Sequence, residues 1–282
     1  MKISIVLPAK NESGAIGLTI KKIHQLNLVD EIIVVNDGST DNTLKVAESA
    51  GAIVISHPYS KGNGAAIKTG ARNATGDIIV FMDADGQHDP EDIPRLIEKI
   101  SEGYDLVVGA RQKGSQASLG RGVANALYNN LATYMTEHRV EDLTSGFRAV
   151  RADKFREFIY LLPNGFSYPT TSTMAFFRAG YSVIYMPIHA AKRIGKSHIQ
   201  PIKDGMRFFI IIFKIATLFS PLKMFIPIAV ILSLIATGWY GYTLYEFGRF
   251  TNMSALLYTG SVMIFLMGLI SEQITALMYK EK

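Results

Sequence analysis

Two long hydrophobic segments at the C-terminal end constrain this chain most. Residues 225–245 (FIPIAVILSLIATGWYGYTLY) contain no charged residue, and residues 255–278 contain one, Glu272. A helix needs about 20 apolar residues to cross the hydrocarbon core of a bilayer. The first segment fits alone, and the second fits if Glu272 lies near an interface. We therefore expect a two-helix transmembrane hairpin within 224–282, in preference to a buried hairpin of a soluble protein.

Charges around the hairpin predict its orientation. The link at 246–254 carries one cation, Arg249, whereas the flanks on the other side are rich in cations. These flanking cations are Lys203, Arg207, Lys214, Lys223, Lys280 and Lys282. Because positively charged flanks remain in the cytoplasm, we expect a multi-pass protein of the cell membrane with its N-terminal body on the cytoplasmic side.

The segment just before the hairpin, 201–223, mixes aromatic and aliphatic residues with Lys203, Asp204, Arg207 and Lys214. That composition is typical of an amphipathic helix that lies in the headgroup plane of a membrane. A buried helix of the preceding body is an alternative that the composition leaves open. Aromatic residues near the far end of the first span suit a membrane interface: Trp239, Tyr240, Tyr242 and Tyr245.

The first 200 residues alternate short apolar runs with amphipathic stretches of helical period. The apolar runs lie at 3–7, 31–35, 52–56 and 77–82. This alternation is typical of βαβ units, so residues 1–200 are predicted to form an α/β domain with a mostly parallel sheet. Polar clusters follow three of the runs, at 8–12, 36–40 and 83–88. Since ligands collect beyond the carboxyl ends of parallel strands, these clusters are candidates for a binding site.

Charge narrows the class of ligand. The formal net charge of +5 suits anionic partners such as nucleotides or lipid phosphates. The sequence contains no dense Lys/Arg run and no basic patch interleaved with aromatic residues, so nucleic acid is not an expected partner. The chain has no cysteine, which excludes disulfides and thiolate metal sites.

Two carboxylates, Asp83 and Asp85, follow the apolar run at 77–82 and are separated by one residue. On an extended chain they would face opposite ways, so a turn must begin there for both to meet one ligand. Carboxylates repel a diphosphate unless a divalent cation bridges them, and such a cation would also neutralise a leaving diphosphate. Two acids at a strand end often only cap a helix, so the pair alone is not specific.

Two further turns accompany the acidic pair. Asp37, in the segment NDGSTDNT, is suited to hydrogen-bond a base or a ribose, although the same segment suits an Asx turn and a helix cap. Residues 61–64, Lys-Gly-Asn-Gly, would let the backbone approach a phosphate closely, or would form an ordinary turn. These elements in this order are far more specific than any one of them.

Six segments in this order resemble the family 2 glycosyltransferases of GT-A fold. They are VLPAKNE (6–12), VVNDGSTDNT (34–43), KGNGAAIKTG (61–70), DADGQHDPED (83–92), TSGFRA (144–149) and KRIGKSH (192–198). More narrowly, the chain looks like the polyprenyl-phosphate glycosyltransferases, the group of dolichol-phosphate mannose synthase. The match covers residues 3–200. The resemblance implies a GT-A, Rossmann-like catalytic domain over 1–200, followed by the amphipathic helix and the hairpin.

The resemblance also implies a set of site residues. The nucleotide would be bound by Pro8, Glu12, Asp37, Lys61, Asp83, Ala84, Arg193, Lys196 and Ser197. Mg²⁺ or Mn²⁺ would be bound by Asp85 and Gln87, and the acceptor phosphate by Arg111, Arg121, Ser145 and Arg148. The catalytic residues would be Asp85, Arg111 and Arg121. Position 10 is often aromatic in relatives but is Lys10 here, and His88 is expected to be a neighbour of the metal and not a ligand.

Physical reasoning supports a phosphate-binding role for the arginines but also leaves other roles open for them. A reaction between two phosphate-bearing substrates needs cations, and arginine offers bidentate phosphate contact. Arg111 and Arg148 nevertheless also suit a salt bridge or contacts to carbonyl oxygens. Asp142 would orient Arg121 or cap a helix.

The expected reaction is the inverting transfer of a sugar from a UDP- or GDP-hexose to dolichyl or undecaprenyl phosphate, with a slight preference for UDP. The acceptor phosphate is already mostly dianionic at pH 7, so it needs no strong general base. One alternative is transfer to a hydroxyl of a lipid-linked glycan, although the Q-x-x-R-W segment of processive synthases is absent. Another is a catalytically idle membrane scaffold, against which the intact Asp83, Asp85 and Gln87 argue. Expected partners are the donor, the lipid acceptor, the bilayer and, as an option, further copies of the chain.

Overall fold

The computed structural model describes residues 1–111, 119–165, 167–189, 213, 217 and 219–278. The chain divides into two compact units, Met1–His198 and Ile199–Lys282. Most of the amphipathic helix expected at 201–223 lies outside the described residues, as do Arg193, Lys196 and Ser197.

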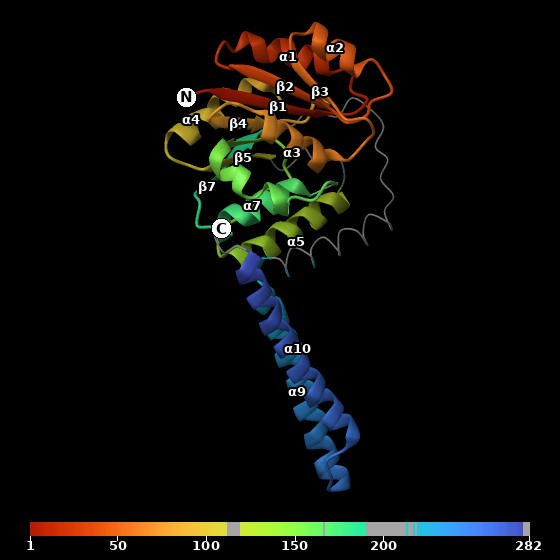
Figure 1. Cartoon of the computed structure of the whole chain (residues 1–282). Coiled ribbons are helices and arrows are strands. Elements are labelled where there is room, and N and C mark those ends of the chain that lie inside the picture. Colours follow the sequence, from red (N-terminus) through yellow and green to blue (C-terminus); the bar gives the residue numbers. More distant parts are fainter. Residues whose placement is uncertain (112–118, 166, 190–212, 214–216, 218, 279–282) are drawn as a thin grey trace. The chain divides into compact units, whose positions relative to one another are not determined.

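The first unit is built on a sheet that has seven strands within the described residues, in the order β3-β2-β1-β4-β6-β5-β7 (Figure 1). The strands are β1 (Ile3–Ala9), β2 (Glu31–Asn36), β3 (Ile53–Ser56), β4 (Ile78–Phe81), β5 (Leu106–Arg111), β6 (Arg148–Arg151) and β7 (Val183–Ile188). Strand β6 runs antiparallel to both of its neighbours, β4 and β5, whereas the other pairs are parallel. This arrangement confirms the predicted α/β fold with a mostly parallel sheet.

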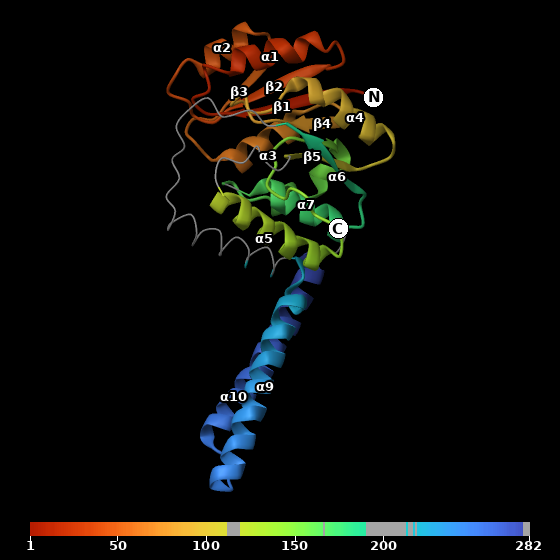
Figure 2. The ribbon, with the colours of Figure 1, turned by 180° about the vertical axis from the view of Figure 1, so that it is seen from behind.

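Helices cover both faces of this sheet (Figures 1 and 2). They are α1 (Ile16–Gln25), α2 (Thr43–Ser49), α3 (Asn63–Asn73), α4 (Ile93–Ser101), α5 (Leu119–Thr136), α6 (Ala152–Glu157) and α7 (Tyr168–Arg178), with short 3₁₀ turns at Pro90–Asp92 and Ile159–Leu161. Helices α1 and α4 pack on one face. On the other face, the ring of Phe81 in β4 lies 4.7 Å from Phe155 of α6 and 6.2 Å from Tyr168 of α7.

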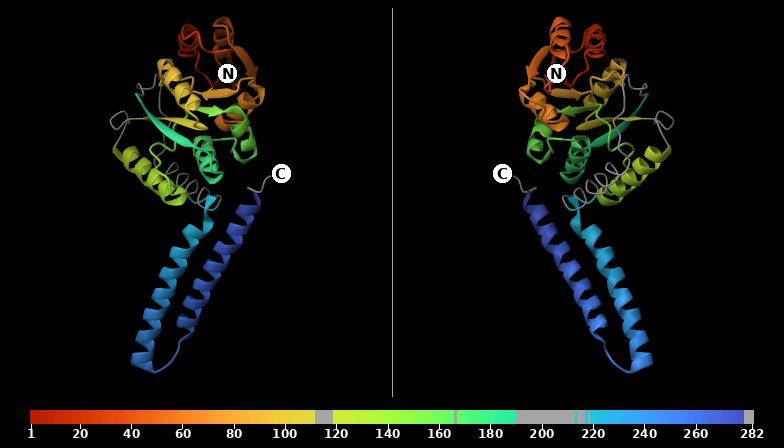
Figure 3. Two further views of the ribbon diagram at one scale, coloured as in Figure 1. Left: turned by 90° about the vertical axis from the view of Figure 1, so that its left-hand side faces the viewer. Right: turned by 90° about the vertical axis from the view of Figure 1, so that its right-hand side faces the viewer.

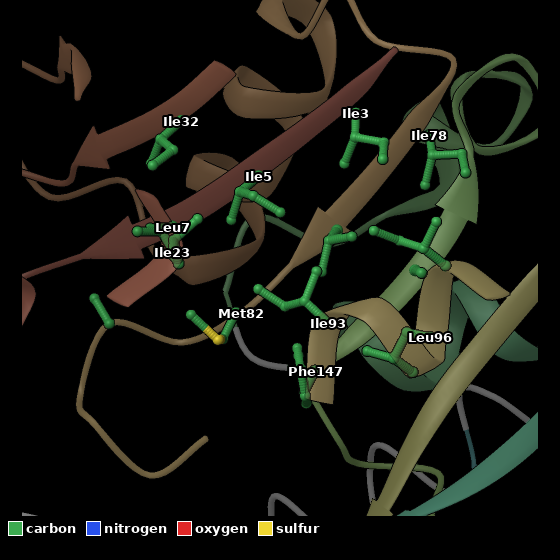
Figure 4. Packing of buried hydrophobic residues seen from close by; sticks show 14 of the residues in the cluster. Ile3, Ile5, Leu7, Ile23, Ile32, Ile78, Met82, Ile93, Leu96 and Phe147 are labelled. Carbon is green, nitrogen blue, oxygen red and sulfur yellow. The ribbon is translucent and has the colours of Figure 1, made fainter. Parts of the chain in front are cut away.

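Side chains alternate between the two faces along each strand, as a pleated sheet requires. In β1, Ile3, Ile5 and Leu7 join the buried cluster with α1 and α4 (Figure 4). Val6 lies on the opposite face against α3, where a Cβ added at Gly70 would come within 2.2 Å of the Val6 side chain. The glycine therefore lets α3 pack closely on the sheet.

The strands β1, β2 and β4 end at the same edge of the sheet. Strands β1 and β2 are paired as far as Ala9 and Asn36, and strands β1 and β4 as far as Val6 and Phe81. The polar clusters that follow these strands therefore meet at one edge, as the alternation in the sequence predicts.

The second unit contains a helical hairpin, α9 (Pro221–Phe247) and α10 (Asn252–Met278) (Figure 3). Both helices are long and apolar enough to cross a membrane, and only 11% and 17% of their most apolar stretches are buried. The first helix begins four residues earlier than the predicted span because Pro221 suits the first turn of a helix. Helices that expose most of their apolar surface in this way are unlike the core helices of a soluble protein.

Small residues lie between the two helices at intervals of seven. Apart from Pro221 at the start of α9, the buried positions are Ala229, Ala236 and Thr243 in α9, and Ser254, Ser261, Gly268 and Thr275 in α10. The Ser261 hydroxyl donates a 2.8 Å hydrogen bond across the hairpin to the carbonyl oxygen of Ala229. Small side chains let helices approach closely where burial of apolar surface drives no association, so this spacing suits a hydrocarbon environment.

Candidate functional site

A cleft of about 440 Å³ lies at the carboxyl ends of β1, β2 and β4 and beside the start of α3. Its volume falls within the range of small-molecule sites. It is lined by Pro8, Ala9, Lys10, Glu12, Asp37, Ser60, Gly62, Asn63, Ala66, Asp83, Ala84 and Asp85. Of the nucleotide-binding residues predicted from the sequence, Pro8, Glu12, Asp37, Asp83 and Ala84 are thus brought together. Among the described residues that line the cleft, four are acidic and one, Lys10, is a cation.

The loops after β1 and β2 are tied to each other. Asn11, at a left-handed φ of 56°, accepts a 2.8 Å hydrogen bond from the Thr40 backbone N–H through its side-chain oxygen. The backbone N–H of Glu12 donates to the Thr43 hydroxyl at 2.9 Å. Asp41 accepts from the Thr43 N–H at 3.0 Å, so Asp41, and not Asp37, serves the start of α2. This bond agrees with the helix-cap alternative for the segment, with Asp41 as the side chain at the start of the helix.

Asp37 instead holds the segment 60–62. Its Oδ1 accepts from the Lys61 N–H at 2.8 Å and lies 2.7 Å from Nδ1 of His57. Its Oδ2 accepts from the Ser60 hydroxyl at 2.7 Å and from the Gly62 N–H at 2.9 Å. Burial raises the pKa of Asp37, but these bonds, that from His57 foremost, lower it to about 2. The carboxylate is therefore ionised and accepts at four positions, which is about its full capacity.

His57 is a site residue that the sequence interpretation missed. It is buried, and its other ring nitrogen, Nε2, lies 2.9 Å from the Thr69 hydroxyl on α3. His57 thereby links the end of β2 to α3. The available signal was its position directly after β3, which matches that of the other polar clusters after strands.

The glycine-rich turn before α3 binds another part of the chain. The N–H groups of Gly64 and Ala65 donate to the carbonyl oxygens of Gly165 (3.0 Å) and Asn164 (2.9 Å). A Cβ added at Gly64 would lie 2.0 Å from the carbonyl oxygen of Pro163. The N–H groups at 61, 62, 64 and 65 therefore already have protein acceptors. The glycines therefore allow the turn at 61–64 to pack closely against residues 163–165. The structure gives no support to the expectation that the backbone of this turn binds a phosphate.

Asp83 and Asp85 both face the cleft because a turn begins directly after β4. Asp85 accepts from the Gln87 N–H at 3.1 Å, and Gly86 has a left-handed φ of 75°. Asp85 is buried, whereas the Asp83 side chain is 36% exposed. A Cβ on Gly146 would lie 2.7 Å from Oδ2 of Asp83, so the TSGF segment needs its glycine to lie against this carboxylate.

The acidic pair fits a divalent cation. Among the described residues, no group of three or more His, Cys, Asp or Glu side chains is arranged to hold a metal alone. Mg²⁺, however, is commonly held by one or two carboxylates and completes its shell with water and substrate phosphates. Oxygen donors suit Mg²⁺ and Mn²⁺ in particular. The donor set at Asp83 and Asp85 therefore fits the predicted ion.

His88 packs behind the acidic pair and does not line the cleft. Its ring stacks on Phe147 at 5.1 Å, and its Nε2 lies 4.0 Å from Oδ2 of Asp83. Burial lowers its pKa to about 4, more than Asp85 raises it. Within the described residues, its Nδ1 has no hydrogen-bond partner. His88 is thus a neutral ring beside Asp83.

Arg111, at the end of β5, forms a two-pronged ion pair with the buried Asp142. The two contacts are Nε to Oδ2 at 2.8 Å and a terminal nitrogen to Oδ1 at 2.9 Å. The same guanidinium donates to the Thr144 hydroxyl at 2.6 Å. Burial raises the pKa of Asp142, but Arg111 holds it below its usual range. Asp142 therefore orients Arg111, while the side chain of Arg121 lies outside the described residues.

Arg148 occupies the interior, which corrects its predicted contact with the acceptor phosphate. Its side chain is fully buried and donates to the Pro169 carbonyl (2.9 Å), to the hydroxyls of Ser172 (2.9 Å) and Thr173 (3.1 Å), and to the Ser145 carbonyl. Ser145 is equally buried. Neither residue reaches a ligand in this conformation, because Arg148 fastens the 144–147 segment to α7.

A mostly parallel α/β sheet with an acidic cleft at its carboxyl edge, followed by a hydrophobic hairpin, defines a membrane-associated protein with a GT-A body. The chain belongs to glycosyl transferase family 2, whose sequence model matches residues 4–159. The model of the GtrB C-terminal hairpin matches residues 220–277.

Several proteins named as transferases are similar to this chain. It is 38% identical over 162 residues to the undecaprenyl-phosphate 4-deoxy-4-formamido-L-arabinose transferase of Proteus mirabilis, which corresponds to 53% of this chain and 49% of that protein. An uncharacterised protein of Methanocaldococcus jannaschii is 34% identical over 166 residues, 56% of this chain and 68% of its own length. The chain spans about half the length of the transferases that it matches.

Solved structures share the fold. Glucosyl-3-phosphoglycerate synthase from Mycobacterium tuberculosis, in complex with Mn²⁺, UDP and phosphoglyceric acid, is 28% identical with a TM-score of 0.59 and covers 76% of each chain. The same enzyme with Mn²⁺ and UDP-glucose is 28% identical, also with a TM-score of 0.59, and covers 76% of this chain and 78% of that one.

Proposed function

We propose that this chain transfers a sugar from a UDP- or GDP-hexose to a membrane polyprenyl phosphate with inversion at the anomeric carbon. The observation that carries the proposal is a cleft lined by Asp37, Asp83 and Asp85 on the same chain as two helices able to cross a membrane. The relatives named as undecaprenyl-phosphate sugar transferases support the acceptor. The family resemblance and the neighbours crystallised with UDP or UDP-glucose support the donor.

The proposed chemistry is a direct displacement. An oxygen of the lipid phosphate forms a bond to the anomeric carbon while the bond from that carbon to the nucleoside diphosphate breaks. The attacking phosphate is mostly dianionic at pH 7, so it needs no proton acceptor. The task of the chain is to position two anions and to screen their repulsion.

Asp85 and Gln87 would hold the divalent cation, and Asp83 beside them would contact the nucleotide. That cation would offset the charge of the donor diphosphate and of the leaving group. The acid pair is presented to the cleft by the turn at Gly86, and Gly146 packs against Asp83. Arg111, fixed by Asp142 at the end of β5, is proposed to face the acceptor phosphate.

Other parts of the proposed site rest on the resemblance. Arg121 would contact the acceptor phosphate, and Arg193, Lys196 and Ser197 would contact the donor diphosphate. The hairpin would span the cell membrane twice with both ends in the cytoplasm, the side on which the phosphate of an inner-leaflet lipid is exposed. Assembly of several copies stays a prediction.

The test is a transfer assay with the full-length protein in membranes. Labelled UDP- and GDP-sugars are supplied with undecaprenyl phosphate and Mg²⁺, and lipid is extracted. Label in the lipid fraction is expected for at least one donor. Asp85→Ala should abolish transfer, whereas Glu91→Ala, which removes an exposed acid from the same loop, should leave it intact. Near-normal transfer by Asp85→Ala with metal present would contradict the metal assignment.

A further inference from the structure

The cleft has two chemically different ends. Asp83 and Asp85 follow β4, Asp37 follows β2, and β1 lies between these strands. In the proposed function, the diphosphate and its cation would lie beside Asp83 and Asp85, so the nucleobase would extend toward Asp37. Lys10 lies at this second end: its Nζ donates to the Ser60 hydroxyl at 3.0 Å, and that hydroxyl donates to Asp37 at 2.7 Å. Lys10, the one cation among the described residues that line the cleft, is therefore engaged at the base end.

Asp37 has no acceptor position left for a base unless one donor leaves. Its four donors are the ring of His57, the hydroxyl of Ser60 and the N–H groups of Lys61 and Gly62. His57 is buried and also bonded to Thr69, and the two N–H groups belong to the backbone. The Ser60 hydroxyl alone is on an exposed side chain that can rotate away. Ser60 is thus the exchangeable donor.

We propose that Lys10, Ser60 and Asp37 select nucleobases that carry an N–H group directly beside a carbonyl group. The base N–H replaces the Ser60 hydroxyl on Asp37, and the Lys10 ammonium, released from Ser60, donates to the adjacent carbonyl oxygen. Uracil offers N3–H beside O4 and O2, and guanine offers N1–H beside O6. Cytosine and adenine present an unprotonated ring nitrogen there, which would leave an ionised Asp37 facing a second acceptor.

This inference rests on the proposed function, because it assumes a nucleotide donor. It adds a specificity role for Lys10 and a displaceable role for Ser60. The position of Lys10 on the chain supports the idea, since Asn11 and Glu12 next to it are fixed to the loop after β2. The ammonium is therefore held near Asp37 and needs only a change of side-chain torsions to meet a base.

The test is nucleotide binding by the full-length protein in detergent with Mg²⁺, measured by calorimetry with UDP, GDP, CDP and ADP. UDP and GDP should bind at least about tenfold more tightly than CDP and ADP, as expected when a charged hydrogen bond is lost. Lys10→Met should weaken UDP and GDP binding by about 10- to 100-fold and change CDP and ADP by less than about twofold. Lys21→Met, at an exposed position on α1, is the matched control and should change nothing.

Ser60→Ala removes the competing hydroxyl, so UDP and GDP should bind equally well or more tightly. Replacing O4 or O2 of UDP by sulfur, a weak acceptor, should lower affinity for the wild type but not for Lys10→Met. This experiment is the chemical equivalent of a double-mutant cycle, so it isolates the contact between the Lys10 ammonium and the carbonyl oxygen of the base. An equal loss for all four nucleotides in Lys10→Met would place Lys10 on the diphosphate and overturn the inference. Equal binding of all four nucleotides by the wild type would overturn it too.

The inference and the proposed function can fail separately. Selective binding of UDP and GDP without sugar transfer to any lipid would uphold the base selection and refute the proposed reaction. Sugar transfer to a lipid together with equal binding of all four nucleotides would uphold the proposed reaction and refute the base selection. Absence of binding for every nucleotide would overturn both.

Discussion

Replacing Gly64 by alanine should destabilise the first unit without any ligand present. The added Cβ would lie 2.0 Å from the Pro163 carbonyl oxygen and 2.9 Å from that of Gly165. Both atoms belong to the backbone, so the 163–165 segment must move away from α3. That movement breaks the hydrogen bonds from Gly64 to Gly165 and from Ala65 to Asn164.

The size of the effect follows from these contacts. Each broken bond costs about 1 kcal/mol net, and a buried N–H group left without an acceptor costs about 1–3 kcal/mol. Alanine in a helix returns about 0.5–1 kcal/mol relative to glycine. The net loss is therefore about 3 kcal/mol. For a unit of this size, that loss lowers the melting temperature by about 6–12 °C.

Thermal unfolding of the full-length protein in detergent, followed by circular dichroism, measures this loss. Gly165→Ala is the matched control in the same contact, because a Cβ there meets nothing within 4 Å, and its melting temperature should shift by no more than about 2 °C. If the glycines served a phosphate, Gly64→Ala would melt like the wild type and lose only nucleotide affinity. That result would refute the role assigned to the 163–165 segment.

Three further predictions concern single groups. Asp142→Asn should lower the free energy of unfolding by about 2 kcal/mol and should reduce sugar transfer, because Arg111 loses its charged partner. An unchanged free energy of unfolding and an unchanged transfer rate would contradict the pairing of Arg111 with Asp142. Asp37→Asn should have a lower free energy of unfolding than the wild type above about pH 4, and this difference should shrink as the pH falls toward 2. The reason is that the pKa of Asp37 is about 2 in the folded state and 3.8 for the free group. A difference in stability that does not depend on pH would contradict this prediction. Trp239 is the only tryptophan, so its emission in vesicles should be quenched by brominated lipids; emission that responds only to aqueous quenchers would exclude a membrane-embedded hairpin.

Most of the fold could be predicted from local patterns in the sequence. The apolar runs at 3–7, 31–35, 52–56 and 77–82 correspond to strands, since alternation of strand and helix is a local property of sequence. Because parallel strands end at one edge, the same pattern predicted that Asp37, Asp83 and Asp85 would meet. The length of the last two segments and their single charged residue, Glu272, were likewise sufficient to predict the hairpin.

The errors concern partners that are distant in sequence. The N–H groups at the start of α3 donate to carbonyl oxygens of Asn164 and Gly165, about a hundred residues away in the sequence. Because the local sequence does not show these acceptors, the turn was interpreted as a candidate phosphate site. Arg148 is buried by α7, which no pattern around the TSGFRA segment indicates. His57 was missed because an isolated histidine after a short strand has no signature until Asp37 is seen beside it.

The most direct test of the account is the chemical form of the lipid product. The full-length protein is incubated with unlabelled undecaprenyl phosphate, Mg²⁺ and the donor that gives label in lipid, and the extract is analysed by mass spectrometry and phosphorus NMR. We expect the lipid phosphate monoester to become a phosphodiester that carries one sugar, with release of one nucleoside diphosphate per product. A lipid phosphate that stays a monoester while sugar is added to a hydroxyl, or is not added at all, would contradict it.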